Sequence, residues 1–333
     1  MWNYIARRFL QLIPTFVGAT ILAFVIIQIA PGDAITRFEL DPTVEREQIE
    51  RLRQQFGLDQ PVPVQYAKWL SGVLFHGYLG ISLDYRSDVW SVIRQPILNS
   101  MVLVVLSTLL IFAVAIPIGV YSAVRKYSLE DRTLTFLAFF GLAVPNFFFG
   151  LIMLYFAIWV NDNMGRPILP IGGMTSQEIG GVPYLEAPWW QRTLDVLWHS
   201  LLPVIVLSTS GMAGLVRIMR GQMLEVLSQD FVRTARAKGV AERMVIYKHA
   251  LRNAVIPIVA GIGGLLPGLI AGAGLVEVVM AWPGITPAFL QAVSAIDIYV
   301  IMGLITISTF LLIIGNLISD LLLAWVDPRI RYN

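Results

Sequence analysis

The sequence predicts an all-α polytopic membrane protein with six transmembrane helices and both termini in the cytoplasm. Of its 333 residues, 56% are hydrophobic and only 14% are charged, and the mean hydropathy is +0.70. A soluble domain carries about a quarter charged residues, so this chain has too few to cover a surface in water. The net charge of +2 is too small to indicate a nucleic-acid partner. The absence of cysteine excludes disulfides, thiolate metal sites and cysteine nucleophiles.

Long apolar stretches supply the spans, because a helix needs about 20 apolar residues to cross a bilayer. Such stretches cover residues 9–30, 101–124, 134–160, 196–219, 254–279 and 300–326. The first follows two arginines, as in a signal peptide, but it is too long for that role. Pro31 also stands where a small-residue cleavage site would be needed. We therefore expect residues 1–30 to be a retained N-terminal anchor helix.

The charges of the loops orient these helices, because lysine and arginine gather in cytoplasmic loops. Segments 125–133 and 220–253 are basic, whereas 161–195 holds two arginines and 280–299 holds none. Both ends of the chain are basic as well. Placing every basic segment inside puts both termini in the cytoplasm, with 327–333 as a cytoplasmic tail.

This orientation leaves residues 31–100 outside as a loop region with short helices. In "DPTVEREQIERLRQQFG", Asp41 can act as N-cap, Pro42 takes the first helical position and Gly57 lies past the end. Two placements stay open for this helix: packing on the protein's own outer face, or a dedicated partner site. The later "YAKWLSGVLFHGYLG" is aromatic and partly apolar, which suits the membrane interface.

Residues 101–326 hold the other five spans and one sizeable basic loop, 220–253. Its centre reads "RTARAKG": Ser228 or Asp230 is available as a cap, and Gly239 can end a short helix in the left-handed conformation. A second helical stretch is expected from Ala241. Contact with lipid headgroups, with nucleic acid or with a cytoplasmic protein would each use such a helix. Nucleic acid is disfavoured because aromatic interleaving is missing.

The stretch "DFVRTARAKG…HALRNA…P" resembles the cytoplasmic loop of ATP-binding-cassette (ABC) importer permeases of the dipeptide, oligopeptide and nickel branch. The general pattern of that loop, E-A-A, three residues, G, nine residues, I-x-L-P, agrees only at Ala235, Gly239 and Leu251. Six further stretches, spread along almost the whole chain, are similar to the first permease subunit of this branch. They are "YIARRFLQLIPTFVGATILAFVIIQIAPGD", "GLDQPVPVQYAKWL", "VPNFFFG", "LPIGG", "VEVVMAWPGI" and "DPRIRY".

The resemblance implies a type I ABC importer permease fold and a function for the basic stretch around "RTARAKG", here called the basic insert. The insert would be the coupling helix, which docks in a cleft of a cytoplasmic ATPase subunit. Its matching residues are Asp230, Arg233, Thr234, Ala235, Arg236, Ala237, Lys238 and Gly239. Small residues would permit close approach, and basic residues could pair with acidic groups.

The resemblance also implies partners in a prokaryotic inner membrane. These are a second, related permease chain, two ATPase subunits and an extracytoplasmic substrate-binding protein. ATP and Mg²⁺ would bind to the ATPases, and no cofactor would bind to this chain. Dipeptides and oligopeptides are the leading substrates, and nickel chelates, glutathione and certain sugars are the alternatives.

Ionisable residues within spans are costly and are therefore candidates for function. His199 and Glu277 fall near the outer ends of their spans, and Arg217 and Asp320 fall near the inner ends. For His199, an interfacial residue satisfied by water or backbone is favoured over a binding role. Arg217 and Asp320 lie at similar depth and could pair.

The stretch "GGLLPGLIAGAG" repeats small residues four apart, which is typical of closely packed membrane helices. Packing within this subunit and packing across a two-subunit translocation path both remain open. Residues 280–297 are expected to form a re-entrant or interfacial helix at the outer mouth. We assign to helix packing or to the path Gly264, Pro267, Gly268, Gly272 and Glu277.

The sequence carries no enzyme signature. It lacks a Walker A loop, H-E-x-x-H, a histidine cluster and G-x-S-x-G. A non-enzymatic permease is therefore the leading interpretation. An ion-coupled secondary transporter is the alternative, disfavoured because ionisable residues are missing from the middle of the spans. A polytopic membrane enzyme comes third.

Overall fold

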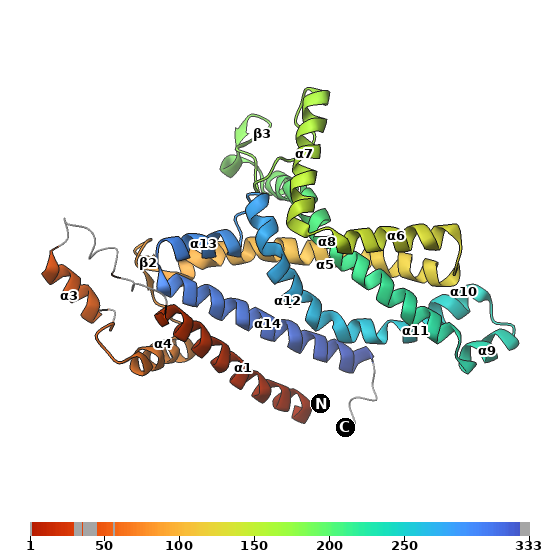
Figure 1. The fold of residues 1–333 in the computed structure, drawn as a ribbon, viewed down its shortest axis with the longest axis horizontal. Coiled ribbons are helices and arrows are strands. Elements are labelled where there is room, and N and C mark those ends of the chain that lie inside the picture. Colours follow the sequence, from red (N-terminus) through yellow and green to blue (C-terminus); the bar gives the residue numbers. More distant parts are fainter. Residues whose placement is uncertain (1, 30–34, 36–44, 56, 327–333) are drawn as a thin grey trace. The chain divides into compact units, whose positions relative to one another are not determined.

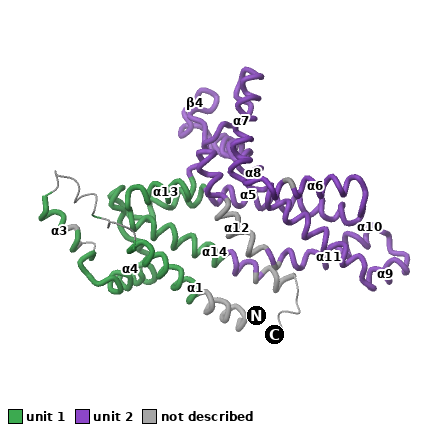
Figure 2. Tube along the Cα trace, viewed as in Figure 1, with its two compact units in different colours: residues 1–99, 284–314 green, residues 100–283, 315–333 purple. Residues whose placement is uncertain are grey.

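Helices make up most of the chain in the computed structural model (Figure 1). The structure describes residues 2–29, 35, 45–55 and 57–326. Within them, the side chains left undescribed are those of residues 2–12, 52, 55, 140, 260, 262–272, 320 and 322–326. The chain forms two compact units, residues 1–99 with 284–314 and residues 100–283 with 315–333 (Figure 2).

The first unit contains α1 (Trp2–Ile29) and the N-terminal part of α14 (Ile298–Val326). Its other elements are α3 (Arg46–Gln55), α4 (Val62–His76), the hairpin of β1 (Ile81–Ser82) and β2 (Ser87–Asp88), the start of α5 (Val89–Val124) and α13 (Ile285–Ser294). Gly57 follows α3 with φ +67°, as predicted, whereas Asp41 and Pro42 lie outside the described residues. The short helix expected within 280–297 is α13.

Helix α4, the predicted aromatic segment, is fastened to α1 by its aromatic side chains. The hydroxyls of Tyr66 and Thr20 are 3.0 Å apart, and the Tyr66 ring meets the Phe24 ring edge-on at 5.5 Å. The indole of Trp69 is buried and donates to the carbonyl of Leu79 at 3.2 Å. Buried Tyr and Trp rings generally find such polar partners. The aromatic face of α4 therefore belongs to the core of the unit.

A buried carboxylate joins the β1–β2 hairpin to the start of α14. Asp297 accepts from the hydroxyl of Ser82 at 2.5 Å and from the backbone N–H of Asp84 at 3.1 Å. It also accepts from the N–H of Val300 at 3.2 Å, as an N-cap residue does. The hairpin and the helix end are thus held by one side chain.

The second unit contains the rest of α5 and of α14 and a chain of helices between them. These are α6 (Leu129–Ala143), α7 (Asn146–Met164), the hairpin of β3 (Glu178–Ile179) and β4 (Val182–Pro183), the 3₁₀ turn η1 (Tyr184–Glu186), α8 (Trp189–Leu227), α9 (Asp230–Ala237), α10 (Glu242–Met244), the π-helical η2 (Val245–Ala250), α11 (Leu251–Ala254) and α12 (Ile256–Val279). Helix α8 contacts α6, α7, α11 and α12, so it is the central helix of this unit.

The predicted span 134–160 is not one helix. It is divided between α6 and α7, which run in different directions (Figure 1). The break falls at Pro145, whose backbone is extended with φ −60° and ψ 136°. Proline lacks an N–H and disfavours helical geometry in the preceding residue, here Val144. The expectation of a continuous helix was therefore wrong, although the proline was visible in the sequence.

Helices α5 and α8 run parallel and in close contact. The Ser208 hydroxyl donates to the carbonyl of Ser107 at 3.3 Å. Further along both helices, a Cβ added to Gly119 would lie 2.6 Å from the Cβ of Met219. Contacts that advance along both helices in the same sense require a parallel pair. An odd number of crossings therefore separates α5 from α8 if both span a membrane.

Four helices of the described chain are long and apolar enough to cross a membrane. They are α5, α7, α8 and the stretch Ile298–Ser319 of α14. Helices α1 and α12 have 28 and 24 residues, which is the length of a span. Helix α5 begins at Val89, well before the apolar stretch that predicted it.

Candidate functional site

The basic insert folds as α9, a short helix set off from the end of α8. The residue before it, Gln229, has an extended backbone and makes no side-chain capping bond. Ser228 instead donates to the carbonyl of Glu225 at 2.7 Å and so closes α8. Asp230 is already the first helical residue. The expectation that Ser228 or Asp230 caps this helix was therefore wrong. Ser228 ends α8, Asp230 is already inside α9, and the cap position between them is Gln229.

The C-terminus of α9 confirms the predicted left-handed glycine. Gly239 has φ +76°. The N–H of Val240 donates to the carbonyl of Ala235 at 3.2 Å, and the N–H of Gly239 to that of Arg236 at 3.0 Å. This pair of bonds is the Schellman motif. No atom lies within 4 Å of the place where a Cβ would stand, so only the backbone conformation demands glycine here.

Helix α9 has one inward face and one broad outward face. Val232 is fully buried, Ala235 is half-buried and the helix packs against η2. The other predicted site residues are exposed, namely Asp230, Arg233, Thr234, Arg236, Ala237, Lys238 and Gly239. Phe231, which the sequence reasoning did not single out, is 40% exposed on the same helix. In the sequence, the only sign of this exposed aromatic residue is its position two residues before the basic stretch 233–238.

Part of the positive charge on α9 is neutralised within the chain. Arg236 donates two hydrogen bonds to Glu242, at 2.7 and 3.1 Å, which join α9 to α10. These bonds stabilise the carboxylate and lower the pKa of Glu242. Arg233 lies 3.5 Å from Asp230 on its own helix. Lys238 has no acidic partner among the described residues, so its charge is available to a partner.

The inward face of α9 packs against the π-helical turn η2. The second helical stretch, predicted from Ala241, begins at Glu242 and passes into η2, where Val245, Ile246 and Ala250 are buried. It then continues through α11 into α12. Single π turns are rare and occur frequently at functional sites. The sequence pattern did not reveal this turn, because hydrophobic periodicity does not resolve it.

An ion pair with a buried carboxylate anchors the helix that leads into α9. The carboxylate of Asp131, at the start of α6, receives the Nε and Nη2 donors of Arg220 at 2.8 and 2.9 Å. It also accepts from the Ser122 hydroxyl and, at 2.9 Å, from the N–H of Tyr127. These bonds, that of Arg220 above all, hold the pKa of Asp131 well below its usual range.

This cluster of hydrogen bonds around Asp131 joins the end of α5, the start of α6 and the C-terminal part of α8. The sequence reasoning missed it, since Arg220 was counted only as a loop charge. The available signal was an acidic pair, Glu130 and Asp131, in an otherwise basic segment.

The polar residues near the other ends of the helices are satisfied inside the second unit. Glu277 is 1% exposed and accepts a hydrogen bond from Ser100. His199 is buried, and its Nδ1 lies 2.9 Å from the carbonyl oxygen of Asp195. The backbone therefore satisfies His199, as predicted. The Asp195 carboxylate in turn holds Ser176 of the preceding loop, with bonds of 2.7 and 2.8 Å.

The remaining candidates for the translocation path lie in or near undescribed side chains. Helix α12 runs without a break through Gly264, Pro267, Gly268 and Gly272, whose surroundings lie outside the described residues. Arg217 is exposed on α8, and the side chain of Asp320 is not described. Their pairing and the packing of the glycine stripe stay predictions.

The arrangement offers a mechanical contact surface. Within the described part of the chain, no three His, Cys, Asp or Glu residues gather in a way that could hold a metal ion. What the chain presents is a short rigid helix with small, basic and aromatic side chains. Two long helices, α8 and α12, connect it to the apolar part of the molecule, so a displacement of α9 would move both.

Two family models match the chain. One, described as "Binding-protein-dependent transport system inner membrane component", covers residues 115–332. The other, "Binding-prot-dependent transport system membrane comp, N-term", covers residues 1–102.

Similar curated proteins align along the whole chain. The oligopeptide transport system permease protein AppB of Bacillus subtilis is 42% identical over 333 residues, 100% of both chains. The dipeptide transport system permease protein DppB of Escherichia coli K12 is 36% identical, covering 100% of this chain and 99% of its own. A di/tripeptide transport system permease protein DppB of Pseudomonas aeruginosa is 35% identical with the same coverage.

Proposed function

Because the chain belongs to the family of binding-protein-dependent transport system inner membrane components, we propose that it forms half of a peptide translocation path and is driven through α9. It is a permease subunit of an ABC importer in the inner membrane of a prokaryote, and it is not an enzyme. The observation that carries the proposal is the geometry of α9: an exposed helix with a buried anchor, Val232, and a strictly defined end, Gly239.

We propose six membrane spans with both termini in the cytoplasm. Helices α1, α5, the α6–α7 pair, α8, α12 and α14 would supply them. The parallel contact between α5 and α8 supports this order, since one crossing, through α7, then separates them. Loops 125–133 and 220–253 come to the cytoplasmic side, which agrees with their basic residues.

In this proposal α9 is the coupling helix. Its outward face would enter a cleft on an ATPase subunit, with Ala237 and Gly239 allowing close approach and Phe231 as an apolar anchor. Lys238 offers a charge for an acidic residue of the partner, whereas Arg236 keeps its partner Glu242. Closure of the ATPases would move α9 as a rigid body, because the Arg236–Glu242 pair and the packing on η2 hold it to the chain.

The assembly would hold a second, related permease chain, two ATPases and a substrate-binding protein. ATP and Mg²⁺ would bind on the ATPases and no cofactor on this chain. The relatives are named as permease proteins of oligopeptide, dipeptide or di/tripeptide transport systems. These names favour a peptide as the substrate over nickel chelates, glutathione or sugars. Lipid surrounds the spans, and we propose no nucleic-acid partner.

Three substitutions in α9 test the coupling role. A β-branched residue in the left-handed region costs about 1–2 kcal/mol, so Gly239→Val should distort the helix end. Ala235→Leu adds bulk to a half-buried position and should displace the docking face. Both should insert normally yet lose co-purified ATPase and stimulated ATP hydrolysis. Arg236→Ala should do less, since an exposed ion pair is worth about 0–1 kcal/mol.

Gly239→Asn is the matched control, because asparagine tolerates the left-handed conformation and should retain the complex. If α9 contacted only lipid headgroups, charge removal would matter and Gly239→Val would be nearly silent. A normal Gly239→Val complex would therefore refute the coupling role. Uptake by the reconstituted protein distinguishes the importer from the alternative, an ion-coupled secondary transporter. Dependence of uptake on ATP supports the importer, and loss of uptake on addition of an ionophore alone would indicate an ion-coupled carrier.

A further inference from the structure

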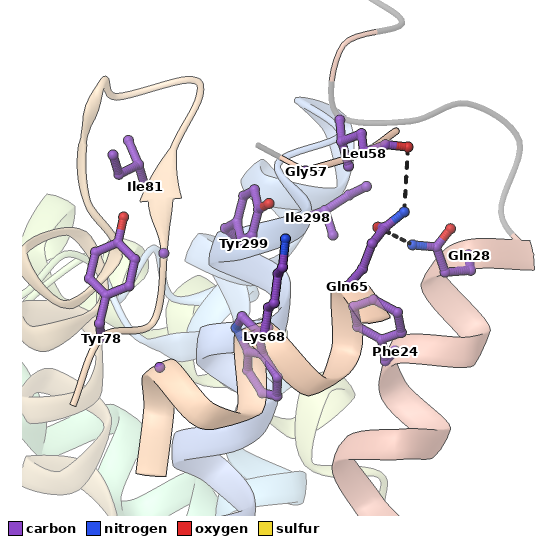
Figure 3. A pocket seen from close by; sticks show the side chains of 13 residues that line it. Phe24, Gln28, Gly57, Leu58, Gln65, Lys68, Tyr78, Ile81, Ile298 and Tyr299 are labelled. Carbon is purple, nitrogen blue, oxygen red and sulfur yellow. Dashed lines mark hydrogen bonds between the residues drawn. The ribbon is translucent and has the colours of Figure 1, made fainter. Parts of the chain in front are cut away.

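The first unit has a partly open cavity of about 300 Å³ beside α1 (Figure 3). Its walls come from α1, the turn after α3, α4, the segment around β1 and the start of α14. The volume lies at the lower end of the range for small-molecule pockets. The proposed coupling role of α9 does not involve this cavity, and the two can be tested separately.

The lining is apolar except for one cation and a few neutral polar groups. Phe24, Trp69 and Ile298 supply apolar walls. Gln65 is engaged within the chain, because its amide nitrogen donates to the carbonyl of Gln60 at 2.8 Å. Its amide oxygen accepts from Gln28 at 3.4 Å (Figure 3).

Lys68 carries the only charge among the described residues that line the cavity. Its ammonium group has no acidic partner in the described part of the chain. An unpaired ammonium group beside apolar walls favours a ligand that brings a negative charge and a hydrocarbon body.

The surface around the cavity is suited to lipid. On α1, which lines the cavity, Leu22 and Ile26 are 63% and 66% exposed. On α4, Leu74 and Phe75 are 56% and 80% exposed. In an inner-membrane protein such side chains meet acyl chains. Lysine can lie with its stem along this apolar surface and its charge at the headgroups.

We propose that this cavity binds one anionic phospholipid, with its phosphate at Lys68 and the upper part of an acyl chain against Phe24, Trp69 and Ile298. A free phosphate ion is best held by several charged donors, and this lining supplies a single charge beside a few neutral polar groups. A zwitterionic headgroup brings its own cation close to Lys68, so an anionic headgroup such as phosphatidylglycerol fits better. The bound lipid would hold α4 to α1 and α14.

Native mass spectrometry of the purified full-length chain tests the site with three probes: phosphatidylglycerol, phosphatidylcholine and glycerol 3-phosphate. Lys68→Gln should weaken binding of phosphatidylglycerol about tenfold, the size of one lost charge-assisted contact, and leave phosphatidylcholine unchanged. Gly72→Leu should weaken both lipids. Its added Cβ would meet the Tyr78 carbonyl at an ordinary 3.4 Å, so the variant should fold while the side chain fills the cavity.

Arg86→Gln is the control for charge alone, since Arg86 is exposed in the same unit and does not line the cavity. It should bind all probes as the unmodified chain does. Unchanged lipid binding by Lys68→Gln would overturn the proposal, as would an equal loss in Arg86→Gln. Unchanged binding by Gly72→Leu would show that the acyl chain lies elsewhere. Tight retention of glycerol 3-phosphate would indicate a soluble phosphate ligand instead.

Discussion

Two buried aspartates show how single residues hold distant elements together in this chain. Asp131 and Asp297 are 3% and 2% exposed, and each accepts several hydrogen bonds. A buried carboxylate stays charged only when such donors replace water. Asp297 receives hydroxyl and backbone donors, whereas Asp131 receives a guanidinium from Arg220 as well. The charge of Asp131 therefore helps to hold the C-terminal part of α8, where Arg220 lies.

Asp131→Asn should destabilise the protein. The change keeps the size of the side chain but removes the charge that Arg220 contacts twice, and a hydrogen bond to a charged group is worth about 1.5–3 kcal/mol. Thermal unfolding of the purified chain in detergent at pH 7 measures the loss. Glu130→Gln is the control, since that side chain is exposed and pairs with Arg125 at 3.3 Å, and its loss should lower the unfolding temperature much less. Equal losses in the two variants would contradict the assigned role of Asp131.

The stabilising effect of Asp131 should depend on pH in a defined direction. Its pKa is lowered in the folded chain, so its contribution is complete above the ordinary value of 3.8 and is lost as the pH falls below that value. The difference in unfolding temperature between the unmodified chain and Asp131→Asn should stay constant from about pH 8 to pH 5 and shrink below about pH 4. A difference that already shrinks between pH 7 and pH 6 would argue against this assignment.

At the scale of elements, one very close helix contact joins α5 and α8. Glycines on either helix permit it: a Cβ on Gly119 would lie 3.1 Å from the carbonyl of Val216, and one on Gly211 would lie 2.5 Å from Cδ1 of Ile111. Small residues commonly let membrane helices approach in this way. In α12 the regular spacing of small residues predicts such packing from sequence. In α5 the glycine stands alone and shows no pattern.

Gly119→Ala should weaken the α5–α8 contact. The new methyl group would overlap Met219 and approach a backbone carbonyl, so the helices must separate, and overpacking of this kind costs about 1–3 kcal/mol. Gly214→Ala on α8 is the matched control, because its added Cβ has no atom within 4 Å. Unfolding in detergent should separate the two variants. Equal stability would mean that α5 and α8 are less closely packed than the structure indicates.

At the scale of the whole molecule, the six-span arrangement makes an experimental prediction about sidedness. The chain has no native cysteine, so single cysteines can be introduced without interference. Lys126→Cys lies in the exposed turn after α5, and Leu185→Cys in a loop position that is 81% exposed. In intact cells an impermeant thiol reagent should label position 185 and spare position 126. The reverse pattern would invert the topology, and labelling of both would exclude six spans.

The fold class and the form of α9 follow from sequence because both rest on local physics. Hydropathy over about 20 residues identifies a membrane span whatever it packs against. Gly239 could be predicted to end α9 because a left-handed residue after a helix favours glycine in any context. Pro145 was equally local, and its effect on the span 134–160 could have been anticipated.

The contacts that position the site were decided only by tertiary structure. Asp131 and Arg220 are 89 residues apart, and neither periodicity nor charge counting pairs them. The anionic-lipid cavity draws on segments from α1 to α14, and Lys68 reads in the sequence as an ordinary loop lysine. Sequence patterns report the preference of each segment for lipid, water or a helix end. Which side chains meet depends on how the helices pack, and that is a property of the folded chain alone.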